Sequence, residues 1–278
     1  MLGRILYNNL DEDHWKDILG TDLWELQEAK DNIIPALRLS YYHLSSPLRV
    51  CFAYCGVFPK GHYFIKDELV CLWMAQCYVK STHSGSMEDV AQTYFDDLRQ
   101  RSFFEYCGGG RFKMHDLIHH LALSLSPGEC SKIEGGKLSN SLEKVRHLWL
   151  EGQAETERLL MPCESNDKLQ YLWTLYMIKK GPGSFSGKFL DDVFLSTKHL
   201  RVLYLCDDEI SELPDSFGSL KFLRYLGISG GQLRRLPETL GNLHYLQTLQ
   251  VKRARSMEEL PKSLKGLVNL RYLKLHRF

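Results

Sequence analysis

The sequence has 278 residues, which is enough for about two domains of ordinary size. Hydrophobic residues make up 44% of the chain and charged residues 25%, a composition typical of soluble globular proteins. Its 35 lysines and arginines nearly balance 34 aspartates and glutamates, so the overall charge favours neither nucleic acid nor an anionic membrane as a partner.

Neither a membrane span nor an export signal is expected, so we expect a cytoplasmic protein. The eight cysteines are unevenly spaced, and several lie in apolar runs: Cys51, Cys55, Cys71 and Cys77. Without an export signal they are expected to be reduced and buried as small hydrophobic side chains. A zinc site at Cys51 and Cys55 would need a second pair of ligands, and Cys71 and Cys77 have the wrong spacing for it. No metal site is predicted.

Residues 1–30 contain two short stretches with apolar residues at helical spacing, among them Leu2, Ile5 and Leu6. Neither stretch is expected to bury its apolar face alone. We therefore interpret residues 1–30 as the helical remnant at the end of a larger region.

A domain of helices and short strands is predicted over residues 31–126. The first helix follows Asp31 and Asn32, which are good helix caps, and the second begins at Ser46-Pro47, a cap followed by proline. Segment 63–65 is β-prone, and segment 69–76 has apolar residues at helical spacing. A capping box from Ser86 to Asp89 begins a further helix, over 87–100.

Two β-prone runs, 102–106 and 111–114, flank the glycines at 108–110 and predict a hairpin. A helix over 115–125 follows and is ended by Ser126-Pro127-Gly128. The order helix, strand, helix, helix, hairpin is that of a winged helix, in which the hairpin is the wing.

Segment 127–142 is rich in glycine, serine and lysine and is interpreted as a linker. Residues 143–278 then carry triplets of the form L-x-x-L-x-L. The regular triplets begin at Leu200, Leu223, Leu246 and Leu270, after weaker ones at Val145 and Leu172. Their spacings of 23, 23 and 24 residues predict an α/β leucine-rich repeat solenoid of about six repeats, truncated at its C-terminal end. The fold class is therefore a helical and winged-helix module followed by this solenoid.

The residues between the leucines of each triplet are expected on the concave face of the solenoid. Candidate protein-binding residues on that face are Trp149, Tyr176, Tyr204, Tyr225, Lys252, Tyr272 and Lys274. Exposed tyrosine and tryptophan are good interface anchors. From Ser196 onward, 14 lysines and arginines outnumber eight aspartates and glutamates, which favours an acidic partner. The alternative is that these aromatic residues are merely common in strands.

Three motifs precede the repeats in a fixed order. Residues 51–60 read CFAYCGVFPK, residues 69–75 read LVCLWMA, and residues 114–116 read MHD. Leu-Pro pairs also recur at 213–214, 236–237 and 260–261, where proline is expected to restrain an extended return path. Together with these pairs, the three motifs resemble plant intracellular immune receptors of the nucleotide-binding, leucine-rich repeat family, coiled-coil class. The resemblance covers nearly the whole chain, and it implies that residues 1–30 end the nucleotide-binding region.

The resemblance also implies roles for residues and partners. His115 would reach the β-phosphate of bound ADP and hold the receptor at rest, with Met114 and Asp116 shaping the turn around it. ATP in place of ADP would break this contact and let the winged helix move. The repeats would sense a pathogen effector or a guarded host protein, or would inhibit the receptor by contacting its own nucleotide-binding domain. Oligomers are implied only for the activated full-length receptor.

The sequence also departs from the family. No segment reads G-x-x-x-x-G-K-[ST], and Gly108-Gly109-Gly110 has neither the lysine nor the strand-to-helix setting of a phosphate loop. This chain alone is therefore expected to bind nucleotide poorly or not at all, because one histidine contact cannot replace a phosphate cradle. No set of residues predicts catalysis, so we do not expect an enzyme.

Three alternatives remain. Segment 115–119 is close to the metalloprotease motif H-E-x-x-H, but aspartate replaces the glutamate and no third ligand is evident. A DNA-binding winged helix should be basic, whereas residues 45–126 hold eight basic and eight acidic side chains. A generic repeat scaffold without nucleotide switching is the non-enzymatic alternative.

Overall fold

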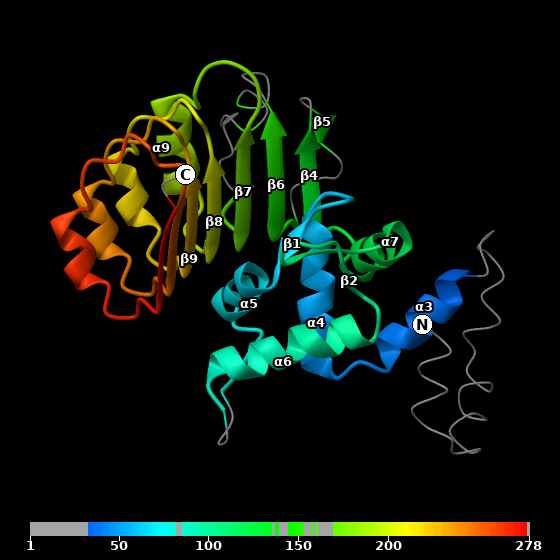
Figure 1. Cartoon of the computed structure of the whole chain (residues 1–278). Helices are drawn as coiled ribbons and strands as arrows, with labels where there is room; N and C mark the ends of the chain where they lie inside the picture. Colours follow the sequence, from blue (N-terminus) through cyan, green and yellow to red (C-terminus); the bar gives the residue numbers. More distant parts are fainter. Residues whose placement is uncertain are drawn as a thin grey trace, which may run out of the picture. The chain divides into compact units, whose positions relative to one another are not determined.

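The computed structural model describes residues 33–81, 85–134, 137–138, 144–152, 157, 160 and 169–276. The chain divides into two compact units, Met1–Pro127 and Gly128–Phe278 (Figure 1). The helical remnant expected at 1–30 lies outside the described residues. Among the residues that are described, no helix is both long and apolar enough to span a membrane.

The first unit has the element order of a winged helix, as predicted. Its helices are α3 (Ile33–Tyr42), α4 (Ser46–Tyr54), α5 (Lys66–Ala75), α6 (Met87–Gln100) and α7 (Asp116–Leu125), with a short 3-10 helix, η2 (Cys55–Val57), after α4. Its strands are β1 (Phe64–Ile65), β2 (Glu105–Tyr106) and β3 (Arg111–Lys113). They form an antiparallel sheet in the order β1-β3-β2, and the hairpin of β2 and β3 is the wing.

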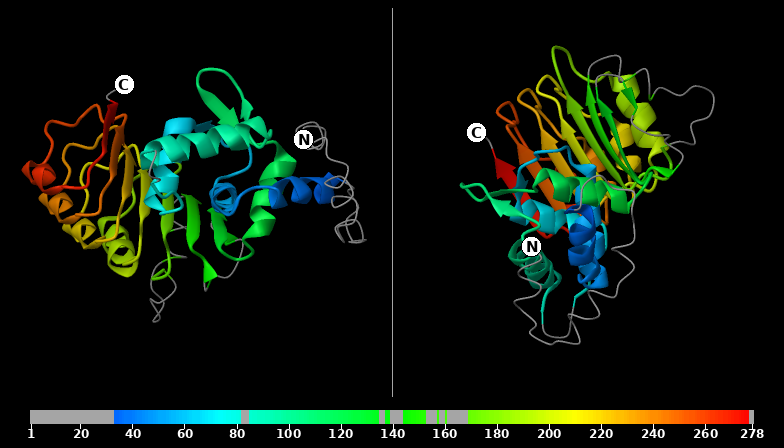
Figure 2. Two further views of the ribbon diagram at one scale, coloured as in Figure 1. Left: turned by 90° about the horizontal axis from the view of Figure 1, so that it is seen from below. Right: turned by 90° about the vertical axis from the view of Figure 1, so that its right-hand side faces the viewer.

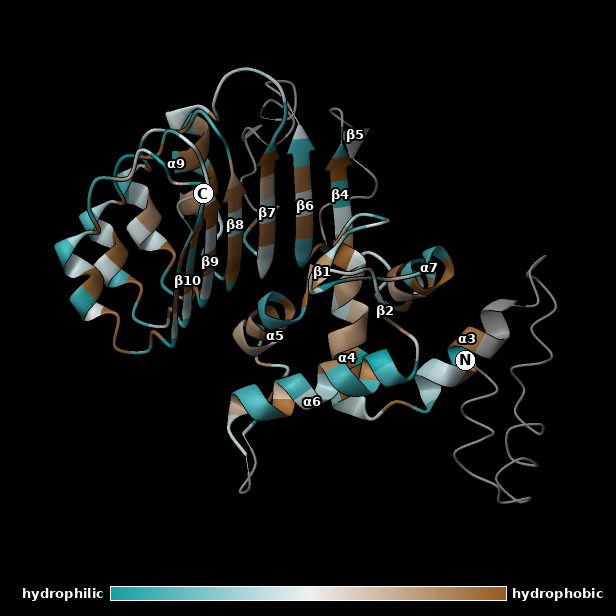
Figure 3. Cartoon of the chain, viewed as in Figure 1, coloured by the Kyte–Doolittle hydropathy of each residue, from teal (hydrophilic) through white to brown (hydrophobic). Residues whose placement is uncertain are grey.

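The start of α6 is fixed by the predicted capping box. The Ser86 hydroxyl accepts a hydrogen bond from the Asp89 amide, and the Asp89 carboxylate accepts one from the Ser86 amide, both at 3.1 Å. This helix buries Ala91, Phe95 and Leu98 and is hydrophilic over most of its remaining surface (Figure 3). It is therefore an amphipathic helix that supports the wing from one side.

The wing is shorter than predicted because two aromatic residues turn into the core. Ser102 ends α6 with a left-handed φ of 65°, and Phe103 and Phe104 follow it into the interior. Phe104 stacks on Phe95 of α6 with centroids 5.1 Å apart, and Phe112 of β3 meets the same ring edge-on at 4.9 Å. These rings hold β3 against α6, so β2 begins only after the two phenylalanines.

Of the four cysteines in apolar runs, three are buried as predicted; outside those runs, Cys107 is exposed and Cys206 is partly exposed. Cys51, Cys55 and Cys71 are buried, and no disulfide joins the described cysteines. Cys77, however, is exposed, and the prediction that it is buried was wrong. It lies just after α5 with a left-handed φ of 63°, and its amide donates to the Met74 carbonyl. This residue closes the helix end and does not belong to the apolar face.

The second unit is a leucine-rich repeat solenoid. Its strands are β4 (Cys130–Glu134), β5 (Lys137–Leu138), β6 (His147–Gly152), β7 (Thr174–Lys179), β8 (Val202–Cys206), β9 (Tyr225–Ser229), β10 (Thr248–Lys252) and β11 (Tyr272–His276). They form one sheet in the order β11-β10-β9-β8-β7-β6-β4-β5. Seven strands are parallel, and β5 pairs with β4 in the antiparallel sense. Segment 127–142, expected as a linker, thus contains the first two strands.

The helical segments of this unit follow one another along one face of the sheet (Figure 2). They are α9 (Gly187–Ser196), η5 (Asp215–Ser219), η6 (Glu238–Asn242) and η7 (Lys262–Gly266). The triplet residues up to β10 point between these helices and the sheet into one hydrophobic core, whereas Leu273 and Leu275 of β11 are 43% and 41% exposed. Pro214, Pro237 and Pro261 each precede a 3-10 helix in extended conformation, as expected for a restrained return path.

Successive 3-10 helices pack closely because glycine recurs at one position. A Cβ atom added to Gly241 would lie 2.6 Å from the Cβ of Ser263 and 2.9 Å from its backbone oxygen. The Glu238 carboxylate ties the same two helices together by accepting the amides of Lys262 and Ser263 at 3.0 and 2.9 Å. A larger residue at Gly241 would have to push backbone aside.

We therefore expect Gly241→Ala to lower the free energy of unfolding by about 1–3 kcal/mol through overpacking. Urea denaturation of the purified chain measures this change. Gly187→Ala is the matched control, because no atom lies within 4 Å of a Cβ at the first position of α9. The control should be neutral or slightly stabilising. Equal midpoints for the two variants would contradict the close-packing explanation.

Candidate functional site

Met114, His115 and Asp116 lie at the junction between β3 and α7. Met114 is buried, whereas His115 and Asp116 are exposed. His115 has extended backbone angles, φ −61° and ψ 149°, and is the N-cap residue of α7. Met114 therefore anchors the turn in the core and presents the next two side chains at the positive end of a helix.

The cap bond of His115 fixes the roles of its two ring nitrogens. Nδ1 accepts a hydrogen bond from the Leu117 amide at 3.3 Å. An accepting ring nitrogen carries no proton, so in neutral His115 the proton lies on Nε2. The ring thus has a defined donor next to the N-terminus of α7, and a hydrogen bond from it would favour an anion.

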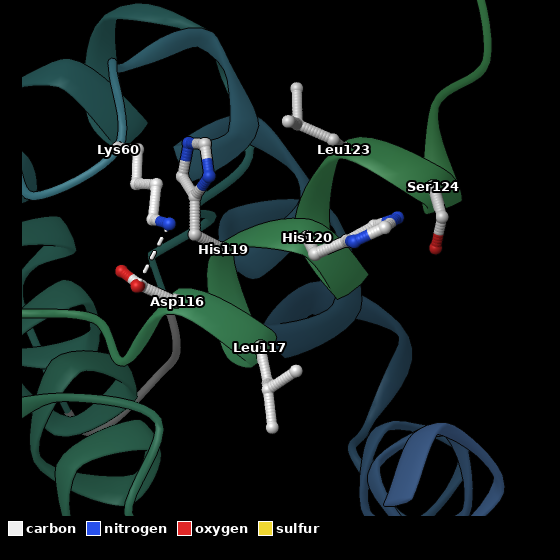
Figure 4. Close-up of a pocket in the computed structure, with 7 residues that line it drawn as sticks. All are labelled: Lys60, Asp116, Leu117, His119, His120, Leu123 and Ser124. Carbon is white, nitrogen blue, oxygen red and sulfur yellow. Dashed lines mark ion pairs between the residues drawn. The ribbon is translucent and has the colours of Figure 1, made fainter. Parts of the chain in front are cut away.

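Asp116 is held by the last residue of the motif at 51–60, a pairing that the sequence did not predict. The Lys60 ammonium, from the loop between η2 and β1, lies 2.9 Å from an Asp116 carboxylate oxygen (Figure 4). The hydrogen bond from Lys60 holds the pKa of Asp116 below its usual value, with further electrostatic contributions from Lys60, His115 and His119. Both side chains are more than half exposed, so the pair positions Asp116 more than it stabilises the fold.

His119 fastens the body of α7 to the rest of the unit. Its Nε2 lies 2.8 Å from the buried carbonyl oxygen of Phe58, and a carbonyl can only accept, so Nε2–H is the donor. Beside this contact lies an open pocket of about 600 Å³. Figure 4 shows its lining residues, which are Lys60, Asp116, Leu117, His119, His120, Leu123 and Ser124. His115 is not among them.

The concave face is built of rows that run across the strands. Trp149, Tyr176 and Tyr204 share one row, which continues through Gly227 and Gln250 to Lys274. Tyr225 and Tyr272 belong to the neighbouring row, and Lys252 belongs to a third. The candidate residues expected on this face are therefore divided among three rows.

The first three rings form a stacked ladder. The ring centroids of Trp149 and Tyr176 lie 5.0 Å apart with an interplanar angle of 17°, and those of Tyr176 and Tyr204 lie 5.4 Å apart with an angle of 30°. Gly227 ends the ladder, because a Cβ there would lie 2.4 Å from Cδ2 of Tyr204. The Tyr225 ring lies beside this glycine, 3.1 Å from the same point, and its hydroxyl donates to Gln250 at 2.6 Å.

Three of the aromatic candidates are buried, so the expectation of exposed anchors was wrong for these three. Trp149, Tyr176 and Tyr225 are 6%, 5% and 2% exposed. Tyr204, Lys252, Tyr272 and Lys274 are partly exposed. The stacking of Trp149, Tyr176 and Tyr204 explains why rings in this row are buried, because in a parallel register each ring covers a face of the next. The sequence reasoning missed a second, exposed stack, His199–Phe222–Tyr245, although the repeat period also marks its positions.

Comparison with known proteins gives consistent matches for both units. A family model described as the disease resistance protein winged helix domain matches residues 57–122. A family model for a leucine-rich repeat region matches residues 193–278. These matches cover the wing with α7 and the regular repeats.

Curated relatives are plant proteins. The putative disease resistance RPP13-like protein 1 of Arabidopsis thaliana is 36% identical over 205 residues, 72% of this chain. The putative disease resistance protein RGA4 of Solanum bulbocastanum is 42% identical over 134 residues, 47% of this chain. The disease resistance protein RPM1 of Arabidopsis thaliana is 31% identical over 230 residues, 77% of this chain. The matches span 19%, 14% and 23% of these relatives, in that order.

The cap bond of His115 can be tested directly. His115→Ala removes the acceptor of the Leu117 amide and should speed hydrogen exchange there about two- to fivefold, the effect of losing 0.5–1 kcal/mol of capping. His115→Asn should keep the amide protected, because asparagine is a strong N-cap. His120→Ala, on the same helix but past its first turn, is the control. Unchanged exchange in the alanine variant would contradict the capping role.

The ion pair of Asp116 can be tested by titration. Lys60→Gln should raise the pKa of Asp116 towards its ordinary value, because the largest cause of the shift is removed. Folding lowers this pKa, so the ionised carboxylate stabilises the fold above the unfolded value and loses that effect as pH falls through the folded value. Carbon-detected NMR of the carboxyl group measures the shift. Lys132→Gln, which removes the partner of Glu134 instead, should leave Asp116 unchanged.

Proposed function

This chain belongs to the plant disease resistance proteins that have a winged-helix domain and leucine-rich repeats, and we propose that it serves in a plant immune receptor. The winged helix relays the nucleotide state of the receptor, and the repeats bind proteins. The observation that carries the first part is the cap bond of His115, which leaves its Nε2–H as a donor at the N-terminus of α7. No catalytic step is assigned to this chain.

In this proposal His115 donates one hydrogen bond to the β-phosphate of ADP held by a nucleotide-binding domain. Two features of the junction fit that role. The first-turn amides and the partial positive charge of the helix favour an anion near His115. The buried side chain of Met114 and the Lys60–Asp116 pair fix the turn on either side of it. One donor does not make a phosphate cradle, so the main binding residues for the nucleotide would belong to that other domain.

The contact also gives the winged helix a way to sense which nucleotide is bound. A hydrogen bond made with ADP and lost with ATP would favour one position of α7 over another, because only a difference in binding can shift such an equilibrium. The resting receptor is the state with the contact. Loss of the His115 donor should therefore favour the active state.

The repeats are assigned to protein recognition. A parallel repeat sheet presents equivalent side chains in long rows, and repeat proteins use such extended surfaces to bind other proteins. Pathogen effectors, guarded host proteins and the receptor's own nucleotide-binding domain are all candidate partners. Within this family the same repeats would then either sense a partner or hold the receptor inactive.

We predict that His115→Ala will raise the resting activity of an assembled receptor. This chain would be joined behind a nucleotide-binding domain of the kind that the proposal places in the complete receptor. The bound nucleotide released on denaturation is measured, together with resting cell death in leaves. The unaltered protein should retain ADP, and the alanine variant should retain several-fold less.

Two further variants separate a contact from a folding defect. His115→Asn keeps the helix cap but has a shorter side chain, so it should fold normally and still lose ADP. His120→Ala, an exposed histidine outside the first turn of α7, should behave like the unaltered protein. If His115→Ala retains ADP and stays quiet at a normal protein level, the proposed role of His115 is wrong.

A further inference from the structure

A second aromatic stack lies along the edge of the repeat sheet where the parallel strands begin. His199 and Phe222 are stacked with centroids 5.8 Å apart at 24°, and Phe222 and Tyr245 are stacked at 6.1 Å and 12°. Each of the three residues comes three positions before the first residue of its strand, so the parallel register of β8, β9 and β10 places them side by side.

Unlike the ladder on the concave face, this stack is exposed. Phe222 is 46% exposed and Tyr245 is 51% exposed, and His199 is also at the surface. A single exposed aromatic side chain needs no explanation, but a contiguous stack of three is a surface patch. Because Phe222 is stacked on both faces, the central ring of this patch offers its edge to a partner.

Basic residues surround the stack. The loops that lead into β7 to β11 have equivalent surface positions. These are residues 170, 171 and 173 before β7; 198, 199 and 201 before β8; 221, 222 and 224 before β9; 244, 245 and 247 before β10; and 268, 269 and 271 before β11. Five of them are lysine or arginine and none is acidic; the five are Lys198, Arg201, Lys221, Arg224 and Arg271. We call these positions the basic aromatic edge. The edge carries only positive charge, although the chain as a whole is almost neutral.

The guanidinium groups are integrated with the rings. Arg146 and Arg201 lie over the Trp173 ring at 4.3 and 4.5 Å, and Arg224 lies over Tyr245 at 5.9 Å. Cation–π contacts of this kind keep the arginines close to the aromatic surface and fix their direction. Acidic residues gather elsewhere in this unit, where Glu212, Asp215, Glu238 and Glu259 line an open pocket of about 510 Å³ on the return path.

We propose that the basic aromatic edge is a docking site for an extended acidic segment of another protein that also carries aromatic or aliphatic side chains. The positive charge of the edge is complementary to carboxylates. The exposed stack adds apolar surface on which aromatic or aliphatic side chains of the partner can pack. The inference rests on the proposed role of the repeats in protein binding and is independent of nucleotide.

The geometry argues against single-stranded nucleic acid as the occupant. Proteins bind single strands by stacking bases on free aromatic faces. In this stack the faces of His199, Phe222 and Tyr245 are turned towards one another, so the central ring has no face open to a base. Carboxylates and apolar side chains, by contrast, can contact ring edges and cations together.

The experiment uses the full chain and fluorescent peptides of defined composition. One peptide alternates glutamate with tyrosine; a second replaces each glutamate with lysine, and a third replaces each tyrosine with serine. Anisotropy should show binding of the first peptide, weakened by salt, and at least about tenfold weaker binding of the other two. A photoreactive version of the first peptide should label residues 198–245.

Two kinds of variant test the edge itself. Phe222→Ser removes the central ring, and the double change Lys198→Glu with Lys221→Glu reverses two exposed charges; each should weaken binding about tenfold. Leu195→Ser is the matched control, because Leu195 is 54% exposed but lies on α9, and binding should be unchanged. His115→Asn should also bind normally, which separates this site from the nucleotide relay.

Several results would overturn the proposal. These are equal binding of the lysine peptide or the serine peptide, full binding by both edge variants, and labelling at Trp149 and Tyr176 in place of the edge. Displacement of the peptide by oligouridylate of equal length would identify a nucleic-acid surface. If the anisotropy change of the peptide depends on self-association of the chain, the edge is a contact between copies of the chain.

Discussion

The constraint on which the second unit depends is that every repeat must return the chain to the same place in the sheet. The first two spacings between strands, from β6 to β8, are 27 and 28 residues and the next three are 23, 23 and 24, yet each repeat brings its triplet back to the sheet beside the preceding one. Parallel pairing then sets equivalent positions side by side, residue by residue, from β6 to β11. Every surface of the solenoid is consequently a set of rows, and the chemistry of a row is the chemistry of one position in the repeat.

This explains what the sequence could and could not predict about the repeats. The period gave the strands, the core leucines and the face on which Tyr204 and Tyr225 lie. It did not separate their rows, because positions two apart in a strand point to the same face. The repeat period also could not predict which tyrosines are buried. Whether a tyrosine is covered depends on neighbours such as Gly227 and Gln250, which belong to other repeats. The first strands were missed because their segment has no leucine triplet.

In the first unit, prediction succeeded where the signal is local. The capping box at Ser86, the glycine turn of the wing and the helix after His115 are all fixed by residues close in sequence. The partner of Asp116 is not fixed by nearby residues. Lys60 precedes β1 and α5 in the sequence, whereas Asp116 follows them, and no periodicity links the two. The tautomer of His115 likewise follows from one backbone contact that only the folded turn creates.

The contacts around α7 differ in strength along the helix, and this difference suits a relay. Its body is fixed by the buried bond from His119 to Phe58 and by apolar side chains such as Ile118 and Leu121. Its first turn is held by an exposed ion pair and one side-chain cap, and exposed contacts of these kinds are individually weak. A partner group that gains or loses one hydrogen bond with His115 therefore competes with interactions of its own size. The junction can change while the helix beneath it stays packed.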